Sequence, residues 1–579
     1  PFYGGGYYRK EAFDRQIRKI ADEWRANRDT VLNSAGGVTA LLRELSEQAG
    51  PDALTDYREL LESSYAFYVK SYDPRGGGFG KAPKFPFPDV FSFLLRYHLR
   101  TGKRGPLQMT VQSLKKMAQG GIRDHLAGGF HRYSTDESWI VPRFEKLLFI
   151  QAQLAVSYTE AFQLSGEPEL GAVAREILDF SLEHLRQGEG GFYSAIDGAD
   201  ACPSDPEKIC QGLYYTWSES ELKSVLGDDY PLVAFAFGVE RGGNIRLEDT
   251  RELSGRNVLF RPVSDLPVAE RFGIERSRVP ATLGRLRDRL LEVRRSRKLP
   301  RVDDKQLAGW NGLMISALAR AYQAFGETRY LNAAEETAAF AAEHLWDRES
   351  GRLRRRYREG AVSGEGFVDD YALLIQGLLD LYESGFSDRW LLLAIDLAEM
   401  QLTLFWDEER GGFFNTPGSD ERLLVRVKEL YDGVEPSPNG VSALNLARLS
   451  VLMKDEDLGG KARKAVAAFS DRFERSPKAK PQLKAAMEFL LAKKKQIVIA
   501  GAKDDPRTAE LVEEVHRRFI PNRVLFLADR GEAHQRLGEK LELLKSVRPI
   551  GGQPTAYVCE DYICQFPTSD PARVAELLN

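Results

Sequence analysis

Two pairs of adjacent aspartates stand where amphipathic helices are expected to begin. The pairs are Asp303-Asp304 and Asp369-Asp370. Two carboxyl groups whose pKa values are held apart can act as general acid and general base. An aspartate in the first turn of a helix can instead do no more than cap free N–H groups and offset the helix dipole. We assign Asp303 and Asp369 to capping, and Asp304 and Asp370 to acid–base chemistry.

Polar and aromatic side chains cluster around these carboxylates in a pattern typical of a saccharide site. Aromatic faces pack against the C–H surfaces of a sugar, and a few fixed polar groups orient it. His131 lies in a further polar loop, where the alternative is a histidine bound by a backbone carbonyl. We predict four catalytic and six substrate-binding residues: catalytic His131, Glu145, Asp304 and Asp370, and binding Arg132, Lys305, Trp310, Asn311, Tyr371 and Asp432.

Metal and thiol chemistry find little support in the sequence. No cluster of His, Cys, Asp and Glu has the spacing of metal ligands, and no Gly-x-Ser-x-Gly motif occurs. We therefore expect no metal and no cofactor. The four cysteines form two pairs, Cys202 with Cys210 and Cys559 with Cys564, and we expect reduced thiols in both. A redox role for Cys559 and Cys564 stays open, although they lack the Cys-x-x-Cys spacing that lowers a thiol pKa.

Composition limits the class of partner. The 579 residues carry 81 basic and 85 acidic side chains, a formal charge of −4. A protein that binds nucleic acid or a membrane surface usually has a basic excess, so we expect neither partner. The longest apolar runs are interrupted by polar residues, and no secretory signal opens the chain. We expect a cytoplasmic protein, processed or cut from a longer chain, because it does not begin with Met.

A glycine motif recurs along the chain. Two glycines and a phenylalanine follow an amphipathic helix at residues 77–79, 128–130, 190–192 and 411–413, with a degenerate copy at 350–353. Repeats longer than one helix indicate supersecondary units that bury their apolar faces against neighbours. We expect these motifs to form short β-hairpins around one mouth of the fold.

Helical periodicity accounts for most of the chain. Apolar residues recur at helical spacing in twelve segments, which begin near residues 55, 89, 107, 145, 168, 308, 328, 369, 387, 438, 459 and 481. Twelve helices make six hairpins, and six hairpins in a ring make a mainly α fold, an (α/α)6 toroid. Helix starts rich in polar and aromatic residues should belong to the inner ring, where their free N–H groups face the mouth.

Three domains follow from changes in this pattern. Residues 1–50 form an extended tip and two helices, and residues 51–495 form the toroid. An insertion at 198–300 interrupts the toroid, with a strand expected over 212–217. Residues 496–579 alternate apolar runs with a helix, which predicts a small α/β unit.

Ten short stretches together resemble one family. They are residues 77–86, 129–134, 144–146, 191–195, 303–305, 310–314, 369–372, 428–429, 431–433, and 556–559 with Cys564. The chain is identified by them as a member of the family of spermatogenesis-associated protein 20. This resemblance implies a toroid similar to N-acylglucosamine 2-epimerases, preceded by a thioredoxin-like domain. Residues 2–8 resemble the end of that domain, so most of it is missing here and it is a possible partner in the full-length protein.

The chain departs from the family pattern at four polar positions. Arg143, Phe149 and Ile150 stand where the family has histidine, tyrosine and aspartate, and Ile196 replaces a glutamate. The family's Pro-Ser-Gly-Asn-Ser also reads Pro-Ser-Pro-Asn-Gly at 436–440. These changes favour a different substrate or a loss of chemistry.

Three functional hypotheses remain open. The first is a sugar epimerase, isomerase or glycoside hydrolase that acts in the toroid cavity on a small saccharide or glycan. Related epimerases use two histidines, and only His131 is available, so the carboxylates are the better acid–base candidates. The second is a scaffold that binds a glycan or protein without catalysis, and the third is a redox-linked accessory protein.

Overall fold

The structure is a computed structural model that describes most of the chain. It covers residues 8–47, 57–202, 205–245, 253–418, 423–429, 432–469, 481–529, 531, 537–538, 541 and 547–578, without the side chains of 45–47 and 200–209. The terminal tip at residues 1–7 lies outside these ranges, as do residues 48–56 and Tyr431.

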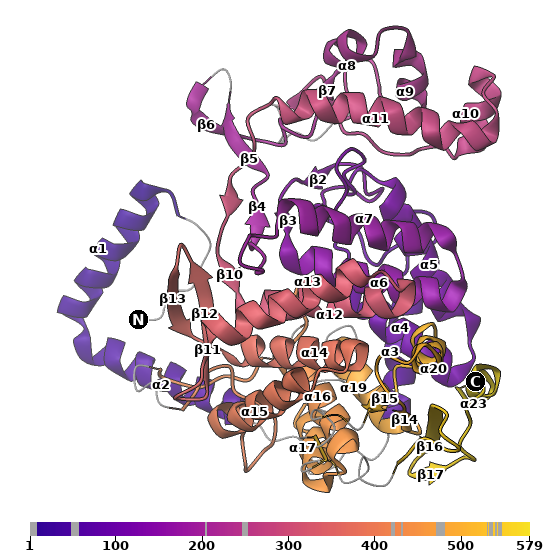
Figure 1. Cartoon of the computed structure of the whole chain (residues 1–579). Coiled ribbons are helices and arrows are strands. Elements are labelled where there is room, and N and C mark those ends of the chain that lie inside the picture. The colour runs from indigo at the N-terminus through magenta and orange to yellow at the C-terminus, as the bar shows by residue number, and fades with distance from the viewer. Residues whose placement is uncertain are drawn as a thin grey trace.

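Six helices form a closed inner ring in the described part of the chain, and Figure 1 labels each of them. Each packs against the next, and α19 packs against α4, which closes the circle. In ring order they are α4 (Pro88–Thr101), α6 (Leu148–Ser165), α12 (Ala308–Phe325), α14 (Val368–Gly385), α16 (Pro438–Met453) and α19 (Pro481–Leu491). The predicted six-hairpin toroid is therefore confirmed.

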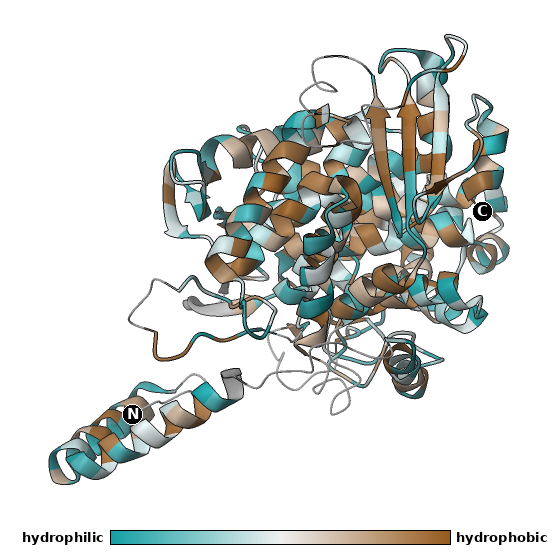
Figure 2. Ribbon diagram, turned by 90° about the horizontal axis from the view of Figure 1, so that it is seen from below, coloured by the Kyte–Doolittle hydropathy of each residue, from teal (hydrophilic) through white to brown (hydrophobic). Residues whose placement is uncertain are grey.

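Six outer helices pair with them. They are α3 (Tyr57–Ser71), α5 (Arg104–Gln119), α7 (Pro168–His184), α13 (Thr328–Phe340, continued to Leu345), α15 (Asp388–Phe405) and α17 (Glu456–Ala467). Helices that are apolar on all sides must be buried, and most residues of α6 and almost every residue of α16 are buried. Figure 2 shows the same distinction, with apolar residues gathered on the inner helices and on the C-terminal strands.

Glycines let two inner helices approach closely. A Cβ atom at Gly312 of α12 would lie 2.5 Å from the backbone oxygen of Leu373 in α14. A Cβ atom at Gly377 would lie 2.4 Å from the oxygen of Gly312. Only glycine fits both positions, because a methyl group there would overlap the facing backbone.

The repeated glycine motifs are tight turns held by an aspartate. In three of them an Asp stands four residues before the first glycine, and one carboxylate oxygen accepts backbone N–H groups inside the turn. Both glycines have positive φ, between 68° and 80°, a conformation that other residues rarely adopt. The turn ends in a single β-bridge at its phenylalanine, so the expected hairpins are present in reduced form.

A lysine from the following loop completes each of these turns. Its ammonium group binds the second oxygen of the aspartate and the carbonyl oxygen of the first glycine. The lysine Nζ to aspartate distances are 2.6 Å for Lys84 and Asp73, 2.7 Å for Lys146 and Asp124, and 2.7 Å for Lys428 and Asp407. We call these three pairs the turn clamps. Each clamp ties the loop that enters the next inner helix to the turn that leaves the preceding outer helix.

The insertion between α7 and α12 has an apolar core of its own. Its elements are β5 (Ala199–Cys202), β6 (Asp205–Gln211), β7 (Trp217–Ser218), α8 (Glu219–Leu226), α9 (Tyr230–Ala236), β8 (Arg256–Asn257), α10 (Asp265–Phe272) and α11 (Val279–Arg295). Figure 1 shows it at the top, beyond β2 (Pro142–Arg143) and β3 (Lys146–Leu147). Arg294 of α11 binds both oxygens of Asp124, at 2.8 and 2.9 Å, and so attaches the insertion to a turn clamp.

The prediction of a strand over residues 212–217 is wrong. Gly212 has φ of 79°, and its carbonyl accepts the N–H groups of Tyr215 and Thr216, so the chain turns there. Trp217 alone of this segment enters a strand, β7, opposite Asn257 of β8.

The C-terminal α/β unit docks on the end of the toroid opposite the mouth. Its sheet has the order β15 (Arg523–Ala528), β14 (Lys495–Ala500), β16 (Thr555–Glu560), β17 (Ile563–Cys564), with β14 parallel to β15 and antiparallel to β16. Helices α20 (Pro506–His516) and α23 (Pro571–Leu578) pack against it. His516 bonds the carbonyl of Glu383 at 2.9 Å, and Arg523 donates to Gln323 at 2.7 Å.

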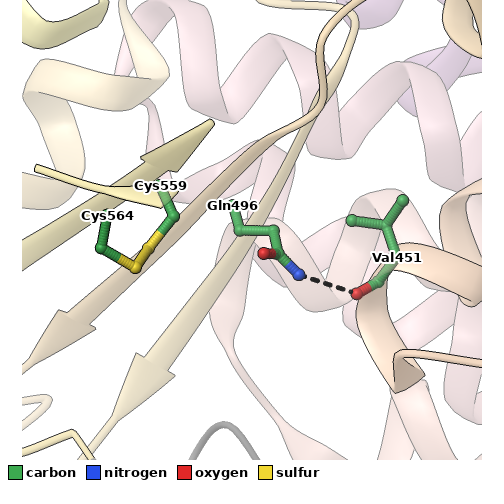
Figure 3. The surroundings of a disulfide bond; sticks show 4 residues. All are labelled: Val451, Gln496, Cys559 and Cys564. Carbon is green, nitrogen blue, oxygen red and sulfur yellow. Dashed lines mark hydrogen bonds between the residues drawn. A yellow bond between two sulfur atoms is a disulfide. The ribbon is translucent and has the colours of Figure 1, made fainter. Parts of the chain in front are cut away.

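The cysteines differ from expectation. Cys559 and Cys564 form a disulfide between β16 and β17 (Figure 3), so the expectation of reduced thiols is wrong for this pair. Beside it, Gln496 of β14 donates to the carbonyl of Val451 in α16 at 3.1 Å, which ties the sheet to the toroid. Cys210 is not a free thiol either. The side chain of Cys202 lies outside the described residues.

Two further helices precede the toroid. They are α1 (Lys10–Ala26) and α2 (Arg28–Glu47), which pack against each other. None of the described helices combines the length and the apolar character that crossing a bilayer requires.

Asp124→Ala tests the clamps. This change leaves Lys146 and Arg294 buried without their shared carboxylate, and losing one partner of a buried pair costs about 3–5 kcal/mol. We expect that loss in the free energy of unfolding, measured in urea. Asp457→Ala breaks an exposed ion pair with Lys461 and should change the free energy of unfolding by less than about 1 kcal/mol. Equal losses in the two variants would contradict a structural role for the clamp.

Candidate active site at the mouth of the toroid

A cavity of about 530 Å³ opens at the N-terminal ends of the inner helices. It lies within the usual size of small-molecule sites, about 300–1,000 Å³. Strand β12 (Arg352–Arg358), the start of α14 and the loops before α16 form its walls. Its polar lining consists of Arg355, Asp369, Asn415, Thr416, Glu429, Glu435 and Ser437.

At the start of α14 the capping aspartate is Asp370, whereas we predicted Asp369. Asp370 is buried and accepts the backbone N–H groups of Phe367 at 3.0 Å and Gly309 at 3.2 Å, so it caps the helix. Asp369 lines the cavity and pairs with Arg355 at 3.2 Å. The catalytic assignment of Asp370 is therefore replaced by a capping role, since its oxygens are used by the backbone.

Arg355 joins both carboxylates. Its guanidinium also contacts Asp370 at 2.7 Å and lies over the ring of Phe367, 4.8 Å from its centre. Burial raises the pKa of Asp370 to about 7, the charge of Asp369 adds to this rise, and Arg355 opposes it. The guanidinium thus holds Asp369 in place at the cavity wall.

Glu435 is the second carboxylate of the cavity. Its Oε2 accepts the indole N–H of Trp310 at 2.9 Å. Burial raises the pKa of Glu435, the indole opposes that rise, and the negative charge of Asp369 adds to it. Trp310 packs edge-on against Phe149, with ring centres 4.8 Å apart. Trp310 therefore contacts the site only through its hydrogen bond to Glu435. Phe149, which replaces the family's tyrosine, packs against Trp310.

The loop that carries Glu435 is fixed by Asp432. This aspartate is buried and accepts the N–H groups of Ser437 at 2.5 Å and Gln482 at 3.0 Å. Its oxygens are thereby used to shape the loop, so the structure gives Asp432 a positioning role in place of substrate contact.

Asn311 and Tyr371 hold glycine turns. Asn311 of α12 accepts the N–H of Phe192 at 2.8 Å and donates to its carbonyl at 3.2 Å. Gln151 of α6 bonds Phe130 in the same way, at 2.8 and 2.7 Å. The Tyr371 hydroxyl accepts the N–H of Leu353 at 2.7 Å. We therefore correct the predicted substrate contacts of Asn311 and Tyr371, whose polar atoms are bound to backbone.

His131 lies in a different region of the molecule. Its ring is buried against Phe144 and Tyr215, and Nδ1 bonds the carbonyl of Phe144 at 2.9 Å. Burial lowers the pKa of His131 to about 3, and Lys146 of the clamp adds to the effect. This histidine does not line the mouth cavity, so its predicted catalytic role is replaced by the structural alternative.

Four other predicted residues also lie off the cavity wall. Arg132 stacks on Tyr133, 5.7 Å from the ring centre, and Glu145 is half-buried near β3. Asp304 pairs with Arg358 at 2.8 Å, and Lys305 pairs with Asp303 at 3.0 Å. Of the predicted residues, Trp310 contacts the cavity wall through Glu435, whereas Asp304, Lys305, Arg132 and Glu145 lie elsewhere.

Sequence reasoning missed Arg355, Glu429 and Glu435. Glu435 immediately precedes Pro436 and an inner helix, and that position was the available signal. Glu429 lies in one of the stretches that resemble the family, but no role was assigned to it, and Arg355 stands in none of these stretches.

A smaller cavity of about 60 Å³ lies deeper on the toroid axis, and Pro436 lines both cavities. Asp89 of α4 lines the deeper one, and burial together with the charge of Asp432 raises the pKa of Asp89 well above its usual range. Gln153 and Gln376 also line it, each with a buried side-chain oxygen that has no protein partner. Among the described residues no group of three or more His, Cys, Asp and Glu is placed to hold a metal ion.

Asn311→Ala separates holding a turn from binding a sugar. A buried donor or acceptor left unpaired costs about 1–3 kcal/mol. We expect Asn311→Ala to lower the free energy of unfolding by about that amount, as should Gln151→Ala, its counterpart on α6. Saccharide affinity, measured by calorimetry, should stay the same in both. Full stability of Asn311→Ala combined with lost affinity would restore Asn311 to the binding site.

Comparison with known proteins supports one assignment. No family model matches the chain. The chain is 39% identical to human spermatogenesis-associated protein 20 and 37% identical to the mouse protein, over its whole length and over 78% and 77% of theirs. Among solved structures, a D-mannose isomerase covers 72% of this chain and 87% of its own (TM-score 0.46, 12% identity). The cellobiose 2-epimerase from Spirochaeta thermophila covers 72% and 85% (TM-score 0.44, 14% identity). The identity to the human and mouse proteins shows that this chain belongs to the spermatogenesis-associated protein 20 family.

Proposed function

We propose that the mouth cavity binds a saccharide and hydrolyses a glycosidic bond, with Glu435 as general acid and Asp369 as the second carboxylate. The observation that carries this proposal is the unequal environment of the two groups. Burial and the neighbouring charge of Asp369 raise the pKa of Glu435, whereas Asp369 is paired with the guanidinium of Arg355. Two titratable groups whose environments differ in this way suit acid and base roles.

The surroundings of the pair support a sugar as substrate. Phe367 supplies aromatic surface, and Asn415 and Thr416 supply hydrogen-bonding groups. In the proposed step Glu435 gives its proton to the leaving glycosidic oxygen. Asp369 then attacks the sugar carbon directly or activates a water, depending on the separation of the two carboxyl groups.

Hydrolysis fits the site better than epimerisation. An epimerase that relied on two histidines would need both in the cavity, and the described cavity wall contains none. The alternative of a glycan-binding or protein-binding scaffold is favoured by one observation. Phe149 packs on Trp310 where the family has a tyrosine, so a hydroxyl next to the site is missing. A redox-linked role, a thioredoxin-like domain and a cytoplasmic location stay predictions.

Glu435→Gln and Asp369→Asn test the assignment. Saccharides would first be screened for a thermal shift, and the release of reducing ends would then be measured with those that bind. General acid–base catalysis contributes about 10²–10⁴-fold, so each variant should lose at least about 100-fold in turnover. Their thermal midpoints should stay the same or rise, because active-site charges often destabilise a fold.

Glu429→Gln is the matched control for these variants. It removes a carboxylate from the same cavity wall, where Glu429 is exposed and bonded to Asn415. It should keep most of the turnover. If a saccharide binds and all three variants bind it equally well, but no protein shows turnover, the scaffold alternative replaces the enzyme.

The pH dependence has a definite direction. Since the folded state raises the pKa of Glu435, turnover should fall as pH rises through that pKa. The same shift favours the folded state at low pH, and this contribution is lost as pH rises through the folded pKa. Glu435→Gln should abolish both effects, measured as the pH profile of kcat and of the thermal midpoint. A rate that rises over the same range would contradict the acid role of Glu435.

A further inference from the structure

A network of arginines and carboxylates fills the toroid axis at the end opposite the mouth. Arg320 bridges Glu160 at 2.7 Å and Asp380 at 2.8 Å. Three further arginines from α4, α16 and β15 complete it. Arg96 pairs with Glu160 at 3.1 Å, Arg448 with Asp380 at 2.8 Å and Glu383 at 3.0 Å, and Arg523 approaches Glu383 at 3.8 Å.

The charges of this network do not balance. Among the described residues it contains four guanidinium groups and three carboxylates, which leaves one positive charge. Arg518, at the rim, pairs with Glu514 and does not change the balance. Asp89, in the cavity next to it, does not compensate either, because burial favours its neutral form by raising its pKa. An uncompensated buried charge is strongly unfavourable, so the network needs a further anion.

Two donor groups in the network have no acceptor among the described residues. Within that part of the chain the Nε of Arg523 makes no hydrogen bond, because Glu383 is 3.8 Å away. The two Nη atoms of Arg523 bind Val515, Arg518 and Gln323. Arg320 uses Nε and Nη1 for its two carboxylates, and Nη2 has no partner in the described part of the chain. Both arginines line a cavity of about 60 Å³, together with Arg96 and Arg448.

We propose that this cavity binds a chloride ion. A water molecule occupies about 30 Å³ in the liquid, so the cavity admits a small ion and excludes a sugar. A neutral water would accept a hydrogen bond but would leave the excess positive charge of the network uncompensated. A monovalent anion offsets that charge and accepts hydrogen bonds from several guanidinium groups. Arg320 belongs to the toroid and Arg523 to the C-terminal unit, so the ion joins the two parts. This proposal is independent of the chemistry at the mouth.

Thermal unfolding in two salts tests the proposal. The protein would be titrated with sodium chloride against sodium gluconate at constant ionic strength, because gluconate is too large for the cavity. A ligand that binds the folded state alone raises the unfolding midpoint as its concentration exceeds Kd. We expect the midpoint to rise with chloride. Arg523→Gln removes the excess charge and should abolish this rise, whereas Arg517→Gln, an exposed neighbour paired with Glu513, should retain it.

Bromide in place of chloride gives a direct readout that needs no variant. Crystals of the unmodified protein in sodium bromide should show an anomalous peak between Arg320 and Arg523. Equal midpoints in chloride and gluconate, a chloride response that persists in Arg523→Gln, or an empty cavity in the bromide crystal would each overturn the proposal.

Discussion

The positions of the loops around the mouth depend on buried lysine–aspartate pairs. A glycine turn alone would leave a carboxylate and a glycine carbonyl facing the loop, and the lysine Nζ satisfies both. The pair is stable only because it is complete, since either charge alone would be buried without compensation. Each clamp therefore determines the course of the chain from an outer helix to the next inner one. The geometry of the candidate site therefore depends on the loops that the turn clamps hold.

The sequence predicts the helices well, because apolar segments of helical length follow starts that are crowded with polar and aromatic residues. Inner helices α12, α14 and α16 begin within one residue of their predicted starts. The candidate site is predicted less well. Asp370, Asn311 and Tyr371 have the residue types of a sugar site, yet their polar atoms bind backbone groups. The sequence does not distinguish a capping aspartate from a catalytic one, because only the structure shows whether its carboxylate oxygens are bonded to the backbone.

The axis of the toroid combines three environments in one line. The mouth cavity is lined by Glu435 and by Asp369 paired with Arg355, the small cavity below Pro436 is lined by Asp89, and the far end has more arginines than carboxylates among the described residues. The C-terminal unit closes that end through Arg523 and His516. The proposed pair, Glu435 and Asp369, lies at the opposite end, in the mouth cavity.

A crystal structure with a bound oligosaccharide tests the central claim most directly. The account predicts a sugar ring against Phe367, with a glycosidic oxygen within hydrogen-bond distance of Glu435, about 2.6–3.2 Å, and Asp369 on the opposite side of the bond. A saccharide bound beside His131 and Glu145, with the mouth cavity empty, would contradict it.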